Sequence, residues 1–355
     1  MKFAVACGGT GGHSFPGLAV AEELRRRGHE VTVWSSGRDI ESSVMKGWTG
    51  PVFPTGARQI AAKNAFAILK SVFACRKELR RDRPDAMLAM GSYSSLPPVL
   101  AAWTRGIPVV LHEANTVPGK AVEFLSRFAR KVAVSFDVTA RHLAGVETVR
   151  TGLPVRGGIA GGKRLAGIPD GSFVVFVTGG SQGAHAVNEL AMEALAMLKD
   201  EIARRGGKRP LYVIHQTGLD DEGAVMRRYA AASLPSRVQA FEHEMADAFA
   251  SADFVVARAG ASTCFELAAC GKPALLIPLP TAMRNHQHFN AEAFAASGAA
   301  DEGDQAVLTP RHLCNYLMAK YENPARLGEM SGRIRALATP DAAARVADLV
   351  EGCAR

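Results

Sequence analysis

The feature that most constrains this chain is a glycine-rich turn that occurs twice, each time directly after a short apolar run. The run Phe3–Cys7 is followed by GGTGGHSFPG at Gly8–Gly17, and the run Ser172–Thr178 is followed by GGSQGAH at Gly179–His185. In both places a segment with helical character follows the turn. A strand, a tight glycine turn and a helix in this order are typical of parallel α/β domains, and the repetition predicts two of them.

Further apolar runs continue this alternation in both halves of the chain. They lie at Val31–Trp34, Ala86–Met90, Val109–His112 and Lys131–Val134, and then at Leu211–His215, Arg237–Phe241, Phe254–Ala257 and Ala274–Ile277. Because these runs are apolar throughout, they predict parallel sheets that are covered by helices on both faces. The predicted fold class is therefore α/β, with two Rossmann-like doubly wound domains that face each other across a cleft.

The Gly- and Pro-rich stretch Thr151–Gly171 separates the two halves and is interpreted as the interdomain linker. A length of 355 residues also favours two domains over a single core. We expect an N-terminal domain over 1–155, a C-terminal domain over 156–339 and a final segment over 340–355. The helix expected at Ala342–Val350 follows Pro340, and we expect it to pack back on the first domain.

Charge and hydropathy narrow the function classes. Lys+Arg 42 against Asp+Glu 34 gives a net charge of +8, which suits a phosphate-bearing small molecule, nucleic acid or an anionic membrane surface. The start of the chain lacks the pattern of a secretory signal, and charged residues interrupt every apolar stretch before it is long enough to span a membrane. The six cysteines form no C-x-x-C pair, which argues against a zinc site. We expect a protein of the cytosol or of the cytosolic face of a membrane.

Both glycine turns are interpreted as phosphate-binding loops rather than as empty tight turns. Glycine lets backbone N–H groups approach an oxygen-rich ligand, and the following helix N-terminus adds partial positive charge. A dinucleotide site fits less well, because Gly9-Thr10-Gly11 is followed by Ser14 instead of a third glycine, and no carboxylate ends the second strand. Neither loop closes with the Gly-Lys-Ser/Thr of a Walker-type nucleotide site.

Polar side chains gather in four other stretches near the ends of predicted strands. Thr263-x-x-Glu266 forms either a capping box at a helix N-terminus or a carboxylate that binds a ribose. Met283–Ala291 supplies amide and imidazole groups that suit a hydroxyl-rich sugar, a composition that ordinary surface loops share. Leu111–Asn115 and Met90–Pro98 end two further strands, and we expect them on the same side as the first glycine loop.

The segment Gln59–Arg81 has the pattern of a basic amphipathic helix. Its apolar residues Ile60, Phe66, Leu69, Val72 and Phe73 alternate with Lys63, Lys70, Arg76, Lys77, Arg80 and Arg81. Such a helix lies on an anionic membrane or, more commonly, packs its apolar side on the sheet. No set of His, Cys or carboxylate residues has metal-ligand spacing, so the prediction is no metal site and no cofactor, with a non-essential divalent cation left open.

Together these motifs resemble the MurG family of bacterial glycosyltransferases over nearly the whole chain. The combination of Gly9–His13 and Pro16 with Gly179–Gly183 and Asn285–Gln287 is specific, whereas either glycine loop alone is not. The resemblance implies a GT-B fold, in which two Rossmann-like domains hold the active site between them. It also implies transfer of GlcNAc from UDP-GlcNAc to undecaprenyl-pyrophosphoryl-MurNAc-pentapeptide, at the cytoplasmic face of the bacterial inner membrane.

The resemblance assigns candidate roles to individual residues. The sugar and the acceptor's diphosphate would meet Thr10, Gly11 and Gly12, with the acceptor loop Gly91, Ser92, Tyr93 and Ser94. The GlcNAc would contact Asn115, His286 and Gln287, and the donor's diphosphate Arg156, Ser181 and Gln182. The nucleotide would be lined by Ala261, Ser262, Thr263, Cys264, Phe265 and Glu266, with Glu266 on the ribose. The backbone near Glu242 would meet the uracil, although Glu242 stands where the family often has an aliphatic residue.

The implied reaction is an inverting displacement, in which the 4-hydroxyl of MurNAc attacks C1 of GlcNAc while UDP leaves. The leaving diphosphate would be stabilised by backbone amides of Gly179–Gly183 and by Arg156. The hydroxyl needs a base, for which His13 is the first candidate and Glu113 the second. The alternative for His13 is to bind the acceptor's diphosphate or to orient its loop. A lipid-linked acceptor also favours the membrane interpretation of Gln59–Arg81.

Two rival functions stay open on the sequence. A UDP-GlcNAc 2-epimerase would use the same fold and donor but no lipid acceptor, and it would form UDP-ManNAc from UDP-GlcNAc alone. A non-catalytic nucleic-acid-binding module is suggested only by the net charge, and an aromatic content of 7% counts against it. The expected partners are therefore UDP-GlcNAc, the lipid-linked acceptor and an anionic membrane surface, with no nucleic acid.

Overall fold

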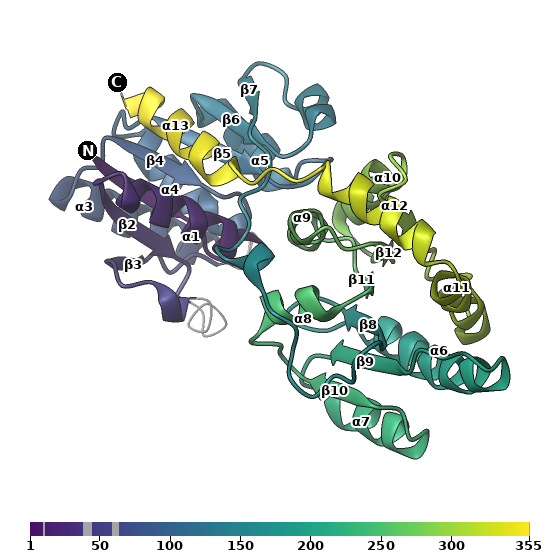
Figure 1. The fold of residues 1–355 in the computed structure, drawn as a ribbon. Helices are drawn as coiled ribbons and strands as arrows, with labels where there is room; N and C mark the ends of the chain where they lie inside the picture. The colour runs from purple at the N-terminus through teal and green to yellow at the C-terminus, as the bar shows by residue number, and fades with distance from the viewer. Residues whose placement is uncertain (10, 38–44, 59–63, 355) are drawn as a thin grey trace. The chain divides into compact units, whose positions relative to one another are not determined.

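In the computed structural model the chain folds into two compact α/β units (Figure 1). The first comprises Met1–Gly157 and Thr339–Arg355, and the second comprises Gly158–Ala338. The structure describes residues 1–9, 11–37, 45–58 and 64–354. Each unit has its own buried apolar core, as expected for a chain too long for a single one.

The described residues of the first unit contain a seven-stranded parallel sheet in the order β3-β2-β1-β4-β5-β6-β7. Its strands are β1 (Lys2–Ala6), β2 (Glu30–Ser35), β3 (Val52–Pro54), β4 (Ala86–Ala89), β5 (Val109–Glu113), β6 (Lys131–Val134) and β7 (Glu147–Arg150). Its helices are α1 (Gly11–Arg26), α3 (Ala65–Arg81), α4 (Leu96–Trp103), α5 (Lys120–Leu125) and α13 (Ala342–Ala354).

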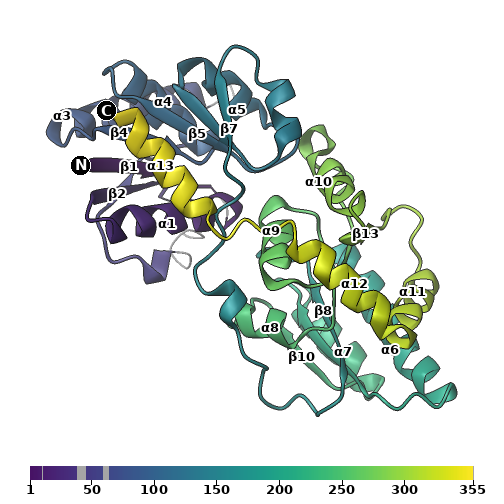
Figure 2. The ribbon, with the colours of Figure 1, turned by 45° about the horizontal axis from the view of Figure 1, so that its top comes forward.

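Helices cover both faces of this sheet because its strands are apolar on both sides. Along β1, Phe3 and Val5 pack into the core beneath α1 and α13, while Ala4 and Ala6 pack beneath α3, α4 and α5. The C-terminal helix α13 lies beside α1, as both views show (Figures 1 and 2), and its Val346 is fully buried. The last residues of the chain therefore complete the core of the first unit.

The described part of the second unit has a six-stranded parallel sheet in the order β10-β9-β8-β11-β12-β13. Its strands are β8 (Phe173–Thr178), β9 (Leu211–Gln216), β10 (Ser236–Gln239), β11 (Phe254–Ala257), β12 (Ala274–Leu276) and β13 (Ala300–Glu302). Its helices are α6 (His185–Arg204), α7 (Glu222–Ala231), α8 (Met245–Ser251), α9 (Ala261–Cys270), α10 (His286–Ala295), α11 (Pro310–Glu322) and α12 (Pro324–Arg335).

The second sheet is also covered on both faces. Phe173, Val175 and Val177 of β8 point into the core formed with α6, α7, α11 and α12. From the opposite face of β8, Phe176 contacts Phe249 of α8, with ring centroids 5.4 Å apart. Both units are thus three-layered and doubly wound, as the apolar strands predicted.

The strand order locates the place where each unit can bind a ligand. In the first sheet the order reverses between β1 and β4, and in the second it reverses between β8 and β11. Doubly wound sheets bind ligands in the crevice at the carboxyl ends of the strands beside such a reversal. The glycine loops after β1 and β8 lie at these two positions.

The structure differs from the sequence prediction at one helix and at three strands. Helix α1 begins at Gly11 instead of Leu18, so that His13 lies in its first turn. The sequence does not reveal this early start, because Gly11, Gly12 and Pro16 are poor helix formers. The strands β3, β7 and β13 were not predicted, since each is a short edge strand whose residues are mostly exposed or half-buried.

Candidate functional site

Hydroxyl groups fix the backbone of the first glycine loop. The carbonyl oxygen of Gly8 accepts hydrogen bonds from Ser94 Oγ at 2.6 Å and from Ser92 Oγ at 3.2 Å. Ser14 Oγ, in the first turns of α1, donates to the carbonyl oxygen of Cys7 at 2.8 Å. The loop after β1 is thereby fastened to the loop after β4. The predicted site residue Thr10 lies outside the described residues.

The loop after β4 approaches His13 closely. Gly91 has φ +78°, and a Cβ there would lie 2.9 Å from Val122 Cγ2 and 3.3 Å from the carbonyl oxygen of His112. His13 Nδ1 lies 2.8 Å from the carbonyl oxygen of Met90. Because a carbonyl oxygen only accepts, Nδ1 carries the hydrogen, and the neutral ring has its lone pair on Nε2. His13 is therefore held in the tautomer that a base needs.

Glu113 holds Asn115 in place at the end of β5. Its Oε1 accepts from the backbone N–H and from the side-chain amide of Asn115, at 2.9 and 3.0 Å, and its Oε2 accepts from the N–H of Gly119 at 3.0 Å. Thr139 Oγ1 donates to the carbonyl oxygen of Asn115 at 2.9 Å. Burial raises the pKa of Glu113, which is 3% exposed, and hydrogen bonds from Asn115, Gly119 and Ala114 offset part of that shift. This geometry favours a positioning role for Glu113 over its predicted role as a second candidate base.

Three predicted segments of the first unit thus meet at the carboxyl ends of the adjacent strands β1, β4 and β5. Arg156 joins them through Phe15 of α1, whose ring centroid lies 4.1 Å from its guanidinium carbon. His112 does not join them as a reactive group, since its Nε2 donates to the carbonyl oxygen of Gly152 at 3.1 Å. Burial lowers the pKa of His112 to about 4, so its ring is neutral at physiological pH.

The second glycine loop, after β8, exposes Ser181 and Gln182 at its tip. Gly180 has φ +86° and Gly183 φ +75°, and a Cβ on Gly183 would collide with the carbonyl of Thr217. The 20-residue helix α6 follows, and no side chain among the described residues caps its N-terminus by a hydrogen bond. Backbone N–H groups at the start of a long helix attract an anion, so this loop fits a phosphate group.

Hydrogen bonds of Glu242 hold the turn after β10. The Glu242 carboxylate is 2% exposed and accepts two hydrogen bonds from the Arg237 guanidinium, from Nε at 2.9 Å and from Nη2 at 3.1 Å. Its backbone N–H donates to Gln216 Oε1 at 3.1 Å. The predicted contact of this backbone with uracil stays a prediction. Neither Arg237 nor Gln216 was predicted from the sequence, although His215-Gln216 is a polar pair at the end of an apolar strand.

Helix α9 settles one alternative left open by the sequence. It begins at Ala261 with Gly260 as its N-cap residue, so Thr263 and Glu266 lie inside the helix and form no capping box. Of the predicted nucleotide contacts, Ala261, Ser262 and Thr263 lie in the first turn, and Glu266 follows with 6% of its surface exposed. Cys264 and Phe265 are 0% and 3% exposed, so their side chains lie in the core, and their predicted contact with the nucleotide stays a prediction.

The predicted sugar-binding segment leads into α10. His286 Nδ1 lies 2.8 Å from the carbonyl oxygen of Met283, and Gln287 Oε1 accepts from the N–H of Leu279 at 2.9 Å. Arg284 and Asn285 both have positive φ, at 53° and 55°, which costs energy for residues with a Cβ. Such conformations cluster at binding and catalytic sites.

The described part of the basic amphipathic segment forms α3. It packs on the sheet through Ser71, Cys75 and Leu79. Its outer face exposes the apolar side chains Phe66 (81%), Leu69 (53%) and Phe73 (62%). Trp103 of α4 and Phe124 of α5, on the same side of the sheet, are also about half exposed. Ile60 and Lys63, which belong to the predicted pattern, lie outside the described residues. No described helix combines the length and the apolar character that crossing a membrane requires.

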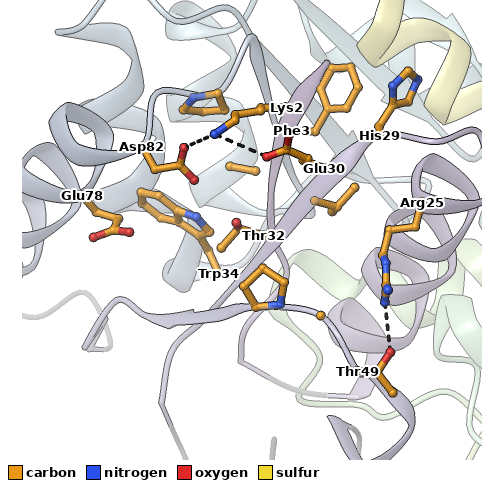
Figure 3. Close-up of a pocket in the computed structure, with 15 residues that line it drawn as sticks. Lys2, Phe3, Arg25, His29, Glu30, Thr32, Trp34, Thr49, Glu78 and Asp82 are labelled. Carbon is orange, nitrogen blue, oxygen red and sulfur yellow. Dashed lines mark hydrogen bonds and ion pairs between the residues drawn. The ribbon is translucent and has the colours of Figure 1, made fainter.

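A pocket of about 450 Å³ is lined by residues of β1 and β2, among them Lys2 and Glu30 at their amino ends (Figure 3). Its lining includes no described residue of the glycine loops. Lys2 Nζ contacts Asp82 Oδ1 at 2.7 Å and Glu30 Oε2 at 3.3 Å across it (Figure 3). These ion pairs join β1 to β2 and to the residue that follows α3. The residues that line the pocket are not among those predicted to bind substrates. The described residues contain no group of three or more His, Cys, Asp or Glu side chains placed to hold a metal ion.

Comparison with known proteins agrees with this arrangement. Residues 3–134 match the glycosyltransferase family 28 N-terminal domain, and residues 174–346 match the glycosyltransferase family 28 C-terminal domain. A UDP-N-acetylglucosamine–N-acetylmuramyl-(pentapeptide) pyrophosphoryl-undecaprenol N-acetylglucosamine transferase from Syntrophotalea carbinolica is 38% identical, over 98% of this chain and 97% of the relative.

Solved structures show the same fold. The crystal structure of Acinetobacter baumannii MurG has a TM-score of 0.77 at 33% identity, with 99% of both chains covered. A UDP-GlcNAc 2-epimerase from Neisseria meningitidis has a TM-score of 0.71 at 12% identity, covering 99% of this chain and 100% of the other, which shows shared fold alone. The predicted GT-B fold is confirmed. The chain belongs to glycosyltransferase family 28 and, within it, to the MurG family.

Proposed function

We propose that this protein transfers GlcNAc from UDP-GlcNAc to the 4-hydroxyl of MurNAc in undecaprenyl-pyrophosphoryl-MurNAc-pentapeptide, with inversion at the anomeric carbon. The observation that carries the proposal is the 38% identity, over nearly the full length of both chains, to a relative named for this transfer. Both glycine loops support the proposal, because each leads into a helix at the point where the strand order reverses in its own sheet.

The donor is proposed to bind the second unit. Its diphosphate would meet the N-terminus of α6 and the exposed loop residues Ser181 and Gln182, where aligned backbone dipoles favour negative charge. The first turn of α9 would line the nucleotide, and Glu266, five residues into that helix, would accept hydrogen bonds from the ribose hydroxyls. Charge that develops on the leaving diphosphate would be stabilised by the same amides and by Arg156.

The acceptor is proposed to bind the first unit, with His13 as the base. His13 Nε2 would take the proton from the 4-hydroxyl while that oxygen bonds to C1 of GlcNAc and the bond from C1 to the UDP oxygen breaks. The hydrogen bond from Nδ1 to the carbonyl oxygen of Met90 supports this role, because it leaves the lone pair of the neutral ring on Nε2. Asn115, held by Glu113, would contact the sugar.

The outer face of α3 is proposed to lie on the anionic cytoplasmic surface of the cell membrane. Its exposed phenylalanines would enter the lipid interface, and Lys70 and Lys77 beside them would attract anionic headgroups. A substrate with a polyprenyl chain stays in the bilayer, so an enzyme that uses it must work at that surface. This contact would place the first unit next to its acceptor.

The test is incorporation of label from UDP-[¹⁴C]GlcNAc into a lipid I analogue. The proposal expects a lipid-linked product that contains both sugars in a β(1→4) linkage. A parallel incubation with UDP-GlcNAc alone is analysed for UDP-ManNAc. Formation of UDP-ManNAc without transfer to the lipid would overturn the proposal and favour the epimerase.

A further inference from the structure

The side chain of Gln216, the last residue of β9, links the loops that follow the two neighbouring strands. Its Nε2 donates to the carbonyl oxygen of Gly180 at 2.6 Å, in the glycine loop after β8. Its Oε1 accepts from the backbone N–H of Glu242 at 3.1 Å, in the turn after β10. Gln216 is 1% exposed, so both ends of its amide are used away from water.

Two side chains, those of Gln216 and Thr178, form hydrogen bonds with the backbone of the glycine loop. Thr178 Oγ1 accepts from the N–H of Gly180 at 3.1 Å and lies 3.4 Å from Gln216 Nε2. Gln216 and Thr178 therefore hold the peptide groups on both sides of Gly180. A loop whose backbone N–H groups bind an anion must keep those groups aligned, and these two side chains fix that alignment.

The backbone beside Gln216 strengthens the link. Thr217 donates its N–H to the carbonyl oxygen of Gln239 at 3.0 Å, and Gly218 donates to that of Ala240 at 3.0 Å. Gly218 also lies so close to the glycine loop that a Cβ on it would be 2.5 Å from the carbonyl oxygen of Gln182. The three loops after β8, β9 and β10 consequently form one packed layer, with Gln216 at its centre.

The turn after β10 has little freedom of its own. The Glu242 side chain is clamped by Arg237, and its Oε1 also accepts from the N–H of Glu244 at 2.8 Å. A displacement of this turn would reach the carbonyl of Gly180 through the side-chain amide of Gln216, alongside the backbone hydrogen bonds from Thr217 and Gly218. A buried amide with both groups bonded transmits such a shift because breaking either bond leaves a buried polar group unsatisfied.

We propose that Gln216 is a positioning residue that couples the phosphate-binding loop to the turn after β10, so that a uridine diphosphate group is bound as one unit by both. The inference rests on the proposed function, because it takes a uridine diphosphate sugar as the ligand of the second unit. Gln216 does not touch the ligand, and it acts through the carbonyl of Gly180 and the N–H of Glu242. Loss of Gln216 weakens ligands that reach both loops more than ligands that reach one.

The test compares three single variants of the full chain. Gln216→Met keeps the length of the side chain but removes both hydrogen bonds, and Thr178→Val loosens only the glycine-loop side. Tyr321→Phe is the matched control, since the Tyr321 hydroxyl bonds the backbone N–H and carbonyl of Arg209, ahead of the opposite end of β9, at 3.0 and 3.1 Å. Calorimetry gives the Kd of UDP and of uridine, steady-state transfer assays give KM and kcat, and a thermal melt gives Tm.

The proposal expects Gln216→Met to raise the Kd for UDP and the KM for UDP-GlcNAc about tenfold, the size of one lost hydrogen bond. The Kd for uridine should change less, and kcat should also fall, because the loop amides that Gln216 aligns are the ones proposed to stabilise charge on the leaving diphosphate. Thr178→Val should also weaken UDP, and the double variant should lose less than the sum of both, because the two side chains share a contact. Tyr321→Phe should lower Tm without changing UDP affinity.

Unchanged UDP affinity in Gln216→Met and Thr178→Val, with Tm lowered as in the control, would overturn the coupling and leave Gln216 a residue of the fold alone. An equal loss for uridine and UDP would also overturn it. If Gln216→Met does not fold, Thr178→Val decides by the same comparison of UDP with uridine. A parent protein that binds no UDP would instead overturn the proposed function and, with it, this inference.

Discussion

Replacing Glu113 with Gln separates two roles that a carboxyl group at the end of β5 can have. In the structure its Oε1 accepts two hydrogen bonds from Asn115, and its Oε2 accepts one from the N–H of Gly119. The amide of Gln keeps an acceptor for Asn115 but turns an N–H towards the N–H of Gly119. The charge-assisted hydrogen bond to Gly119 is lost, and the two hydrogen bonds to Asn115 are weakened. Because removing a buried charge partly offsets these losses, the free energy of unfolding should fall by about 2 kcal/mol.

Transfer kinetics over a range of pH then distinguish the roles. If Glu113 positions Asn115, the variant should raise KM for UDP-GlcNAc several-fold, lower kcat modestly and keep the pH profile of the parent. Ser126→Ala is the control, because it removes one hydrogen bond, from Ser126 Oγ to the carbonyl oxygen of Glu123 at 2.8 Å, away from the loops. A fall in kcat of about 100-fold or more, with loss of the acidic limb of the profile, would refute the positioning role and make Glu113 the base.

Three further predictions follow from the same geometry. His13→Asn, whose side-chain amide can still donate to the carbonyl oxygen of Met90, should lower kcat by about 100- to 10,000-fold, and His13→Ala should do the same. A kcat near that of the parent in His13→Asn would show that the ring only orients the loop. Phe73→Ser should weaken binding to anionic vesicles about tenfold, whereas Arg345→Glu on α13, which covers the opposite face of the sheet, should not; equal effects in sedimentation would remove α3 from the membrane contact. The rings of His112 and His215, whose pKa values burial lowers to about 4 and about 3, should stay neutral from pH 8 to 5 by ¹⁵N NMR. Histidines in the unfolded chain take up a proton near pH 6.5, so the stability that the folded protein gains by keeping these rings neutral is complete above that pH. It is lost as the pH falls towards 4 and then 3. Titration of either ring near pH 6 would contradict the burial.

Much of the architecture is predictable from the sequence because the central strands are buried on both faces. The runs at Lys131–Val134 and Phe254–Ala257 match β6 and β11 residue for residue. The edge strands β3, β7 and β13 cannot be predicted in this way, because an edge strand needs no continuous apolar run and each of these is only three or four residues long. The start of helix α1 could not be predicted either, because its first turn contains glycines, which are poor helix formers.

The site was predictable as a set of loops but not as a set of contacts. Strand-end motifs indicated the loops around His13 and Asn115, because parallel strands bring their carboxyl ends to one edge of a sheet. The partners of Glu113 and Glu242 were not predictable, because Gly119 and Arg237 owe their positions to the paths of loops and to neighbouring strands. Gln216 belongs to this group as well, since its two hydrogen bonds join segments that only the sheet order makes neighbours.

The central claim is that the reaction of UDP-GlcNAc is coupled to the 4-hydroxyl of a lipid-linked MurNAc. The most direct measurement is the release of UDP from UDP-GlcNAc with a lipid I analogue, with the same analogue lacking the 4-hydroxyl, and with no acceptor. One UDP should be released for each lipid-linked disaccharide formed with the intact analogue, and only background release should occur in the other two reactions. UDP release or UDP-ManNAc formation at the same rate in all three reactions would contradict it.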